Sequence, residues 1–378
     1  MGNVLPRSME EEPMSKKIGF LSHLDLNLYL FRAPIIKELV SKGHKVYAVC
    51  PSGDKNDALK SLGCEVVNYE ISRKGLNPFA ELLTIKKIYE VIKPLDLDIL
   101  QNFTAKPNIY GSIAGKKANI SLVCNAVTGL GSFYIDDSFK SKVVKTIMNT
   151  LYKYANSKAD RCIFQNSDDM KYFVDSGFVD TKKAVLIKSS GIDTEAFVSQ
   201  EIHKNEKISI LMIARAIWHK GIKEFYEAAS LLKDLNVSFT LVGDTDEHNP
   251  SCANKEFLQN ENVQWLGHRD DIKEQIDRCD IFVLPSYREG VPRTLLEAAS
   301  MGKPIVTTDA VGCREVVDDG VNGYLVPVKD GKALAEKIKV LVEDENMRKE
   351  FGKASRKKAV EEFDVKVVVE QYLRLYDV

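Results

Sequence analysis

The stretch ISILMIARAIWHKG, at residues 208–221, decides the fold. Its first seven residues form a continuous apolar run, which is the pattern of a strand buried on both faces of a parallel sheet. A turn that carries Arg215 and Lys220 follows, and a helical pattern begins directly after it. A buried strand, a charged turn and a helix together form the repeating unit of a doubly wound α/β domain.

The same unit recurs along nearly the whole chain. In the second half we expect further strands at SFTLVGD, VQWLGH, IFVLPS, PIVTT and GYLVP. In the first half we expect them at KIGFLSH, KVYAVCP, EVVNYEI, LDILQNF, SLVCNAV, RCIFQN and AVLIKS. Helical patterns such as APIIKELVSKG and SDDMKYFVDSG lie between the strands and close on glycine. The sequence therefore predicts an α/β protein with two Rossmann-like doubly wound domains facing a cleft, with ligands at the carboxyl ends of the strands.

The domain boundaries follow from breaks in this pattern. The polar, aperiodic segment SQEIHKNEK at residues 199–207 is expected to be a linker. We place the first domain at residues 14–198 and the second at 208–363. After a break at Phe363 and Asp364, a C-terminal helix at 364–378 is expected to pack back on the first domain. Residues 1–13 precede a second methionine and are interpreted as an expression leader.

Composition excludes several classes of protein. The chain is 44% hydrophobic and 28% charged with a net charge of −1, which is ordinary for a soluble globular protein. No apolar run approaches the roughly 18 residues that a membrane-spanning helix needs. The near-zero net charge and the lack of a recognisable nucleic-acid-binding module argue against nucleic-acid partners. Seven scattered cysteines without CxxC spacing favour reduced thiols in a cytosolic protein.

The charge is unevenly distributed. Between residues 14 and 199, 26 lysines and arginines stand against 19 aspartates and glutamates, a net charge of +7, so the remainder of the chain is acidic. A basic half and an acidic half indicate two domains with different partners.

The turns after the second-half strands carry residues suited to a nucleotide. Arg215 and Lys220 beside a helix N-terminus form a good diphosphate site, because the dipole and free N–H groups add to the side-chain charges. The alternative is that both are solvated loop charges. Asp244, His268 and Arg269 follow two further strands and are candidates for lining a base pocket.

The segment EGVPRTLLE at residues 289–297 has a glutamate at each end. Acidic residues near a helix N-terminus oppose the helix dipole, which would explain Glu289 but not Glu297, about one and a half turns into the helix. The turn from Gly290 to Thr294 brings backbone amides to that helix start, and Leu295 follows it. One carboxylate suits the hydroxyls of a sugar ring and the other suits a ribose diol.

Together these elements carry a family likeness. Arg215 with Lys220, the Glu-x7-Glu element and GCREVVDDGVNGYLVP at residues 312–327 resemble the retaining glycosyltransferases of family 4, which have the GT-B fold. The resemblance covers nearly all of the chain after the leader. It implies that Arg215 and Lys220 hold the donor diphosphate, that Glu289 contacts the donor sugar and that Glu297 contacts the nucleotide ribose. It also implies transfer with retention and without a metal or other cofactor, because the two cations neutralise the leaving group.

The donor set that this resemblance implies is wider than the catalytic trio Arg215, Lys220 and Glu289. Its further members are Ser22, Asp244, His268, Arg269, Gly290, Thr294, Leu295 and Glu297.

A finer likeness concerns IARAIWHKGIKEFYEAA, NPSCA and GLGSFYID. They resemble the branch of bacterial enzymes that extend polyprenyl-diphosphate-linked sugars in protein N-glycosylation of the Campylobacter type. The resemblance implies UDP-N-acetylgalactosamine as donor and undecaprenyl-diphosphate-linked diacetylbacillosamine as acceptor. It places the enzyme peripherally on the cytoplasmic face of the cell membrane.

The first domain is expected to hold the acceptor. The segment SHLDLNLYLFR at residues 22–32 stands where the family has a loop that reaches the donor phosphates and the acceptor, which makes Ser22 and His23 candidates. A histidine at a strand end with no second function is the alternative for His23. Further acceptor-binding candidates follow the fourth and fifth strands: Asn102, Thr104, Lys106, Thr128 and Gly129. Many family members carry a histidine after the fourth strand; this sequence has none there, and Lys106 becomes a candidate phosphate contact. The alternative for the loop at Thr128 and Gly129 is a plain strand–helix turn.

The segment at residues 139–161 combines apolar and basic residues. Phe139, Val143, Ile147 and Leu151 recur every four residues among several lysines. Such a stripe is the usual pattern of a core-facing helix, and it also fits an anionic membrane surface, where a polyprenyl-diphosphate acceptor would lie.

Functions other than metal-independent transfer also fit parts of the sequence. The Asp-x-Asp pair at residues 96–98 precedes a strand, whereas the pair at 244–246 follows one and is the better metal candidate. A non-hydrolysing UDP-sugar epimerase also has two Rossmann-like domains. The remaining alternatives are a family-4 transferase of another surface polysaccharide and an idle nucleotide-sugar-binding module.

Overall fold

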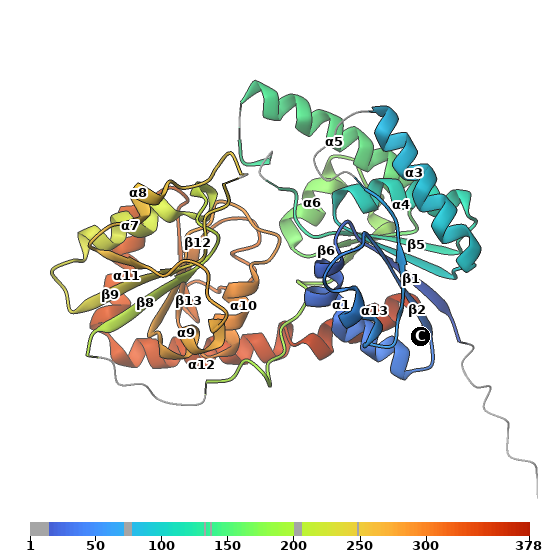
Figure 1. The fold of residues 1–378 in the computed structure, drawn as a ribbon. Coiled ribbons are helices and arrows are strands. Elements are labelled where there is room, and N and C mark those ends of the chain that lie inside the picture. Colours follow the sequence, from blue (N-terminus) through green and yellow to red (C-terminus); the bar gives the residue numbers. More distant parts are fainter. Residues whose placement is uncertain (1–14, 72–77, 132–133, 137, 200–205, 248) are drawn as a thin grey trace, which may run out of the picture.

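The computed structural model describes residues 15–71, 78–131, 134–136, 138–199, 206–247 and 249–378. The expected leader and most of the expected linker lie outside these residues. The described chain forms two α/β halves, each built on one parallel sheet (Figure 1). The predicted fold class is therefore confirmed.

The first sheet has seven strands in the order β3-β2-β1-β4-β5-β6-β7, all paired in parallel. Its elements are β1 (Lys17–Leu21), α1 (Asp25–Ser41), β2 (Lys45–Cys50), α2 (Asn56–Lys60), β3 (Glu65–Asn68), α3 (Pro78–Ile92), η1 (Lys93–Leu95), β4 (Ile99–Phe103), α4 (Ala105–Lys117), β5 (Leu122–Val127), α5 (Phe139–Lys158), β6 (Arg161–Phe164), α6 (Ser167–Asp175), η3 (Thr181–Lys183) and β7 (Ala184–Leu186). Each strand coincides with an apolar run that the sequence marked as a strand.

The second sheet has six strands in the order β10-β9-β8-β11-β12-β13, again all parallel. Its elements are β8 (Ile208–Ile213), η4 (Trp218–Lys220), α7 (Ile222–Leu231), β9 (Val237–Val242), α8 (Lys255–Leu258), β10 (Val263–Trp265), α9 (Ile272–Arg278), β11 (Ile281–Leu284), α10 (Arg293–Ser300), β12 (Ile305–Thr308), β13 (Gly323–Val326), α11 (Gly331–Glu343), α12 (Glu345–Glu362) and α13 (Val365–Tyr376).

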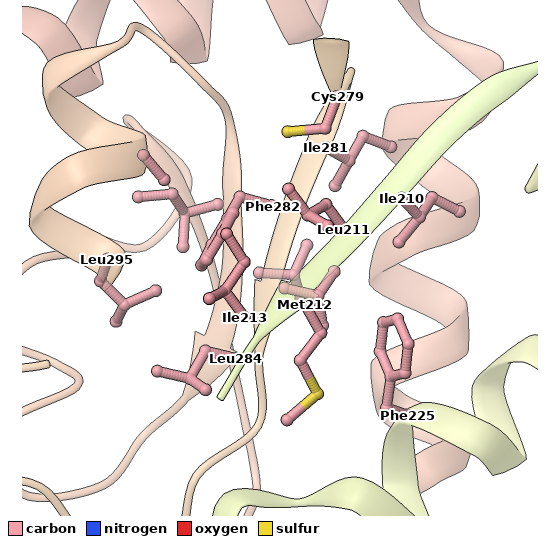
Figure 2. Close-up of a cluster of buried hydrophobic side chains, with 14 of the residues drawn as sticks. Ile210, Leu211, Met212, Ile213, Phe225, Cys279, Ile281, Phe282, Leu284 and Leu295 are labelled. Atoms are coloured by element: carbon pink, nitrogen blue, oxygen red, sulfur yellow. The ribbon is translucent and has the colours of Figure 1, made fainter. Parts of the chain in front are cut away.

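The core of the second half explains why ISILMIA reads as a continuous apolar run. Strand β8 is central in its sheet, so its side chains are covered on both faces. Figure 2 shows the side chains of β8 and β11 between Phe225 of α7 on one side and Leu295 of α10 on the other. Burial on both faces removes the polar alternation that a half-exposed strand would show.

The last helix lies away from the half that precedes it in the sequence. Helix α12 runs along the second half, and α13 lies against the first half (Figure 1). Val368, Val369, Tyr372 and Tyr376 of α13 are buried in the same cluster as residues of α1 and β1. The tyrosine hydroxyl of Tyr376 donates to Gln101 Oε1 at 2.9 Å, which ties the end of the chain to β4.

Helix α1 differs from the sequence prediction. A loop was expected over residues 22–32, but the helix begins at Asp25. Its buried face carries Leu28, Arg32, Ile36 and Leu39, and the charged position in that row conceals the helical period from a reading of apolar residues alone. The connection after β1 is therefore only three residues long, which draws α1 close to the cleft.

Within the described ranges, every helix is too short or too polar to cross a bilayer. All seven cysteines are free thiols.

Candidate functional site

A cavity of about 370 Å³ lies between the carboxyl ends of the two sheets. Its walls come from both halves, because residues directly after β1, β4 and β5 face residues directly after β8 and β11. The predicted site residues that line it are Ser22, Thr104, Thr128, Arg215, Lys220, Glu289, Gly290 and Thr294. The topology of two parallel sheets thus brings together eight of the seventeen candidates, from five separate turns.

Lys220 and Glu289 form an ion pair at the centre of this wall. Their side chains are 20% and 14% exposed, so the pair is partly shielded from solvent. Ser286 Oγ donates a second hydrogen bond to Glu289 Oε1 at 2.6 Å. Two donors on one carboxylate oxygen fix the orientation of Glu289, and its other oxygen takes no part in these contacts.

Two glycines permit the close approach of chain segments here. Gly221 has φ +79°, and a Cβ atom at this position would lie 2.1 Å from the carbonyl oxygen of Pro285. A Cβ atom on Gly290 would lie 2.2 Å from the carbonyl oxygen of Thr128. A side chain at Gly290 would therefore force apart the loop of the first half and the loop of the second half. Gly129, an expected acceptor residue, lies against the backbone of Gly290.

A second hollow of about 450 Å³ adjoins the first and shares Arg215 and Thr294 with it. The expected base-pocket residues Asp244, His268 and Arg269 line this hollow. Arg215 lies at the junction, where its Nη1 donates to Asp246 Oδ2 at 2.7 Å. Arg269 makes a two-pronged contact with Asp271, which orients its guanidinium at the rim.

The carboxylates of the Asp-x-Asp candidate are engaged in other contacts. Asp246 pairs with Arg215, and Asp244 Oδ1 accepts from the Thr245 amide at 2.8 Å. Among the residues that the structure describes, His, Cys, Asp and Glu side chains form no group of three that could hold a metal ion.

Glu297 lies behind the cavity wall rather than in it. Its carboxylate is almost fully buried and accepts from Arg293 Nε at 2.9 Å. Burial raises the pKa of Glu297 above its ordinary value, and the neighbouring Arg293 opposes that shift. Leu295 is also displaced from its expected place, because its side chain belongs to the core of the second half. Only its backbone remains for a ligand.

Arg293 connects Glu297 to the first half of the molecule. Its Nη1 donates to the carbonyl oxygen of Leu30 in α1 at 2.9 Å, and its guanidinium carbon lies 5.5 Å from the ring centre of Phe31. That carbonyl is available because Pro34 follows four residues later and has no N–H to offer it. A proline inside α1 thus leaves an acceptor that an arginine from the other half fills.

Four of the expected acceptor residues are already bonded within the protein. A ring nitrogen of His23, Nδ1, lies 2.7 Å from Thr104 Oγ1. Lys106 pairs with Glu81 at 2.7 Å, and both side chains are largely shielded. Asn102 is buried beneath the cavity, where its amide donates to Asn125 at 2.9 Å. A phosphate would have to compete with Glu81 for Lys106.

Several residues that line or brace the cavity were not predicted from the sequence. Arg32 and Phe103 line it from the first half, Arg293 lines it from the second, and Ser286 orients Glu289. Arg32 could have been noticed in the sequence, because it is a charged residue at a position where the period of α1 calls for an apolar one. Ser286 and Arg293 gave no such signal, because their roles depend on neighbours distant in the sequence.

The start of α6 is a further junction between the halves. Asn166 Nδ2 donates to the Gly290 carbonyl at 2.8 Å, and the Ser167 amide donates to Glu315 at 2.7 Å. Arg288 forms an ion pair with the fully buried Asp169. These contacts hold the loop that carries Glu289 against the first half.

Two family models match the chain. The model described as "Glycosyl transferases group 1" matches residues 193–358, and the one described as "Glycosyl transferase 4-like" matches residues 17–166. The 4-like model covers β1 to β6 of the first sheet, and the group 1 model covers the whole second sheet.

The relatives extend over the whole chain. The chain is 42% identical over 373 residues to the N,N'-diacetylbacillosaminyl-diphospho-undecaprenol alpha-1,3-N-acetylgalactosaminyltransferase of Campylobacter jejuni, covering 96% of this chain and 98% of that protein. It is 25% identical to the capsular polysaccharide biosynthesis glycosyltransferase CapM of Staphylococcus aureus, covering 96% and 97%. Among solved structures, Anabaena Alr3699/HepE in complex with UDP and glucose superposes with a TM-score of 0.76 at 20% identity, covering 96% and 99%.

Proposed function

The chain belongs to the group 1 and family-4-like glycosyltransferases, and from this premise we propose that it is a retaining N-acetylgalactosaminyltransferase. Its donor is UDP-N-acetylgalactosamine, and its acceptor is undecaprenyl-diphosphate-linked diacetylbacillosamine, in protein N-glycosylation. The observation that carries the proposal is the 42% identity to an enzyme named for that reaction, which spans both halves and therefore both the donor and the acceptor sides of the cleft.

The cavity has the charges that this reaction needs. The acceptor hydroxyl forms a bond to the anomeric carbon of the donor while the bond from that carbon to UDP breaks, and the hydroxyl proton passes to the departing diphosphate. Negative charge grows on the diphosphate during this step. Arg215 and Lys220 are proposed to stabilise it, since preorganised cations aimed at developing charge lower the barrier most. Both line the cavity.

The two glutamates divide the recognition of the donor. Glu289 faces the cavity with one carboxylate oxygen held by Ser286 and Lys220, which leaves the other for a sugar hydroxyl. Glu297 lies deeper and is proposed to receive the ribose diol, with Arg293 as its counter-charge. Asp244, His268 and Arg269 line the adjoining hollow, which has room for the base.

Retention follows from the stereochemistry of the proposed substrates. UDP-N-acetylgalactosamine carries its diphosphate in the α configuration, and the Campylobacter relative is named for an alpha-1,3 product. An α donor that gives an α product requires the acceptor to attack on the face from which UDP departs. Acceptor and leaving group must then share one side of the sugar, which suits a cavity walled by both halves.

The acceptor is proposed to enter from the first half. Thr104 and Thr128 line the cavity opposite Glu289, and His23 lies against Thr104. Gly129 brings its loop against Gly290, so this wall reaches the donor side.

A membrane-facing surface on α5 is consistent with a lipid-linked acceptor. Phe139, Val143, Ile147 and Leu151 are 84%, 43%, 52% and 38% exposed, so this stripe is not the core-facing side of the helix. Helix α5 lies at the outer side of the first half (Figure 1). We propose that this stripe and the helix lysines dock on the anionic cytoplasmic face of the membrane, because apolar and basic residues both favour such a surface.

The test is incubation of the purified protein with UDP-N-acetylgalactosamine, with and without a short-chain polyprenyl-diphosphate-linked diacetylbacillosamine. We expect UDP release coupled to an α-linked disaccharide product only when acceptor is present. UDP-sugar epimerisation without acceptor would reject the transferase proposal in favour of an epimerase. Transfer to other lipid-linked sugars in preference to diacetylbacillosamine would reject the acceptor assignment alone.

A further inference from the structure

Arg32 occupies an unusual position for a charged side chain. It lies on the buried face of α1, in the row that holds Leu28, Ile36 and Leu39, and it is 4% exposed. Its side chain also lines the cavity between the two halves. Arginine keeps its positive charge in proteins at all ordinary pH values, so the first half presents a buried cation at the wall of the substrate cleft.

The contacts of Arg32 leave this charge without a counter-ion. Its guanidinium carbon lies 4.2 Å from the ring centre of Phe103. Its Nη1 is buried and has no hydrogen-bond partner, and no carboxylate of the described chain lies within 4 Å of it. Stacking on an aromatic ring offsets only part of the cost of burying an unpaired ion.

The other cations of the cavity wall differ from Arg32 in this respect. Each of the other three has a carboxylate partner: Arg215 with Asp246, Lys220 with Glu289 and Arg293 with Glu297. Arg32 is therefore the cavity cation whose partner the described part of the chain does not supply. A buried charge without a counter-ion destabilises the free protein. Functional sites can retain such a charge where a bound ligand supplies the counter-charge.

We propose that Arg32 binds an oxyanion of a diphosphate that enters the cleft. This proposal rests on the proposed function, in which both substrates carry a diphosphate. The guanidinium matches phosphate oxygens through paired N–H donors, and these charge-assisted hydrogen bonds are stronger than neutral ones. The shared chemistry is the diphosphate group, which either the UDP of the donor or the polyprenyl diphosphate of the acceptor supplies.

Binding measurements with two probes separate the sources. Arg32→Met removes the guanidinium and its charge but leaves an unbranched apolar side chain at this buried position, whereas Arg32→Lys retains the charge. Titration with UDP measures affinity at the donor diphosphate site. Titration of UDP-saturated protein with inorganic pyrophosphate measures affinity at a second diphosphate site. We expect Arg32→Met to weaken one of the two by about tenfold to a hundredfold, the range for a charge-assisted hydrogen bond, and Arg32→Lys to recover part of the loss.

The control is Arg161→Met, which removes an exposed arginine at the start of β6. It should change neither affinity. A weaker affinity for UDP in Arg32→Met assigns the donor diphosphate, and a weaker affinity for pyrophosphate alone assigns the acceptor diphosphate. Equal affinities in wild type and Arg32→Met for both probes would overturn the proposal.

Thermal unfolding without ligand gives an independent readout. Removing an uncompensated buried charge should leave the midpoint of Arg32→Met equal to or above that of the wild type, whereas a purely structural arginine would lower it. A lowered midpoint with unchanged affinities would again overturn the proposal. None of these measurements needs sugar transfer, so a protein that binds UDP but transfers nothing would refute the proposed function while the assignment of Arg32 is still decided.

Discussion

At the scale of single residues, the proposed recognition of the donor depends on Lys220, for which Glu289 and a diphosphate would compete. Lys220 contacts Glu289, and Glu289 is also held by Ser286. A diphosphate that approaches Lys220 competes with Glu289 for the same ammonium group. Because Ser286 keeps the carboxylate in place, Glu289 would stay directed at the sugar of the proposed donor when Lys220 turns to its diphosphate. Under the proposed function, Lys220 would thus link recognition of the diphosphate to recognition of the sugar.

The first prediction concerns the two cations of the donor site. Arg215→Ala or Lys220→Ala should lower kcat about a hundredfold to a thousandfold, the usual cost of removing one preorganised contact to developing charge. The loss should fall mainly on kcat, because charge grows on the diphosphate as the glycosidic bond breaks. Steady-state kinetics with UDP-N-acetylgalactosamine measures this. Lys223→Ala, an exposed lysine on α7, is the control, and unchanged kcat in both site variants would reject the assignment.

The second prediction separates the two glutamates. Glu289→Gln should impair transfer more than it impairs UDP binding, because Glu289 faces the cavity where the sugar would lie. Glu297→Gln should weaken UDP binding itself, since Glu297 is proposed to hold the ribose. Calorimetry with UDP and kinetics of transfer, with Glu361→Gln on α12 as the exposed control, give the comparison. The opposite order would mean that the two roles are exchanged.

The sequence predicted the site residues that follow from strand topology, but not those that depend on contacts distant in the sequence. Thr104, Thr128 and Arg215 come at or just after strand ends, and Lys220 ends the turn that follows β8. Because the carboxyl ends of parallel strands meet at one edge of a sheet, strand prediction alone located these residues. Arg293 could not be assigned in this way. Its partner on α1 is 263 residues away, and the acceptor there exists only because of a proline in another helix.

At the scale of elements, a hydrogen bond between Arg293 and the Leu30 carbonyl joins α10 to α1. It forms because that carbonyl has no helical hydrogen-bond partner. Without an N–H at residue 34, the Leu30 carbonyl cannot make its helical bond and accepts from Arg293 instead. Helix α10 carries the proposed ribose contact, and α1 carries Arg32. The bond therefore connects a helix of the donor side with a helix at the opposite wall.

The third prediction tests this bond by a double-mutant cycle. Pro34→Ala supplies an N–H that competes for the Leu30 carbonyl. The loss of unfolding free energy on Arg293→Met should then be smaller in the Pro34→Ala background than in the wild type, by on the order of 1 kcal/mol. Chemical denaturation of the four proteins measures the difference. Equal losses in both backgrounds would show that the Arg293 contact with Leu30 contributes nothing.

Helix α5 shows where periodicity alone was insufficient. The spacing of Phe139, Val143, Ile147 and Leu151 fits a core-facing stripe as well as a membrane-facing one. The structure buries a different side of the helix, with Ser141, Tyr152 and Ala155 turned inward. The buried side combines Tyr152 with small and polar residues such as Ser141 and Ala155, so hydrophobicity alone did not mark the side that packs.

The fourth prediction concerns this exposed stripe. Replacing both Phe139 and Ile147 with serine should weaken binding to vesicles that contain anionic phospholipid by at least about tenfold. Full burial of one such apolar side chain contributes about 1.5–3 kcal/mol, and serine loses most of this contribution. Vesicle co-sedimentation measures the binding. Activity on a soluble short-chain acceptor should persist, since neither residue lines the cavity.

The matched control for α5 is Leu231→Ser, an equally accessible leucine on α7 in the second half, which is 53% exposed. It should leave vesicle binding unchanged. If the double variant binds vesicles as tightly as the wild type, the protein docks through another surface.

At the scale of the whole molecule, the two halves meet through charges that flank the loop carrying Glu289. Arg288 precedes Glu289 and pairs with Asp169, and Arg314 pairs with Asp168 at 3.1 Å. Both acidic residues belong to the first turn of α6, where they also oppose the helix dipole. The sequence showed an acidic start of α6 and a basic loop far downstream, but only the relative placement of the two sheets joins them.

The Arg288 pair with Asp169 is the deepest of these contacts. Asp169 is fully buried and Arg288 is 18% exposed. Burial raises the pKa of Asp169, although Arg288 and a hydrogen bond from Asn166 act in the opposite direction. An ion pair of this depth is expensive to form, so its effect appears when one partner is removed and the other remains buried without a counter-charge.

The last prediction follows from this. Asp169→Asn and Arg288→Met should each lower the free energy of unfolding by about 3–5 kcal/mol, and the double variant should lose much less than the sum. Each single variant should also lower kcat/KM, because Arg288 adjoins Glu289 and the first half holds the loop in place through it. On the same helix, Lys171 and Asp175 form an exposed pair at 2.8 Å, for which the same cycle should give a coupling of only about 0.5 kcal/mol. Additive losses at Asp169 and Arg288 would show that the two halves are held together by the neighbouring backbone contacts at Gly290 instead.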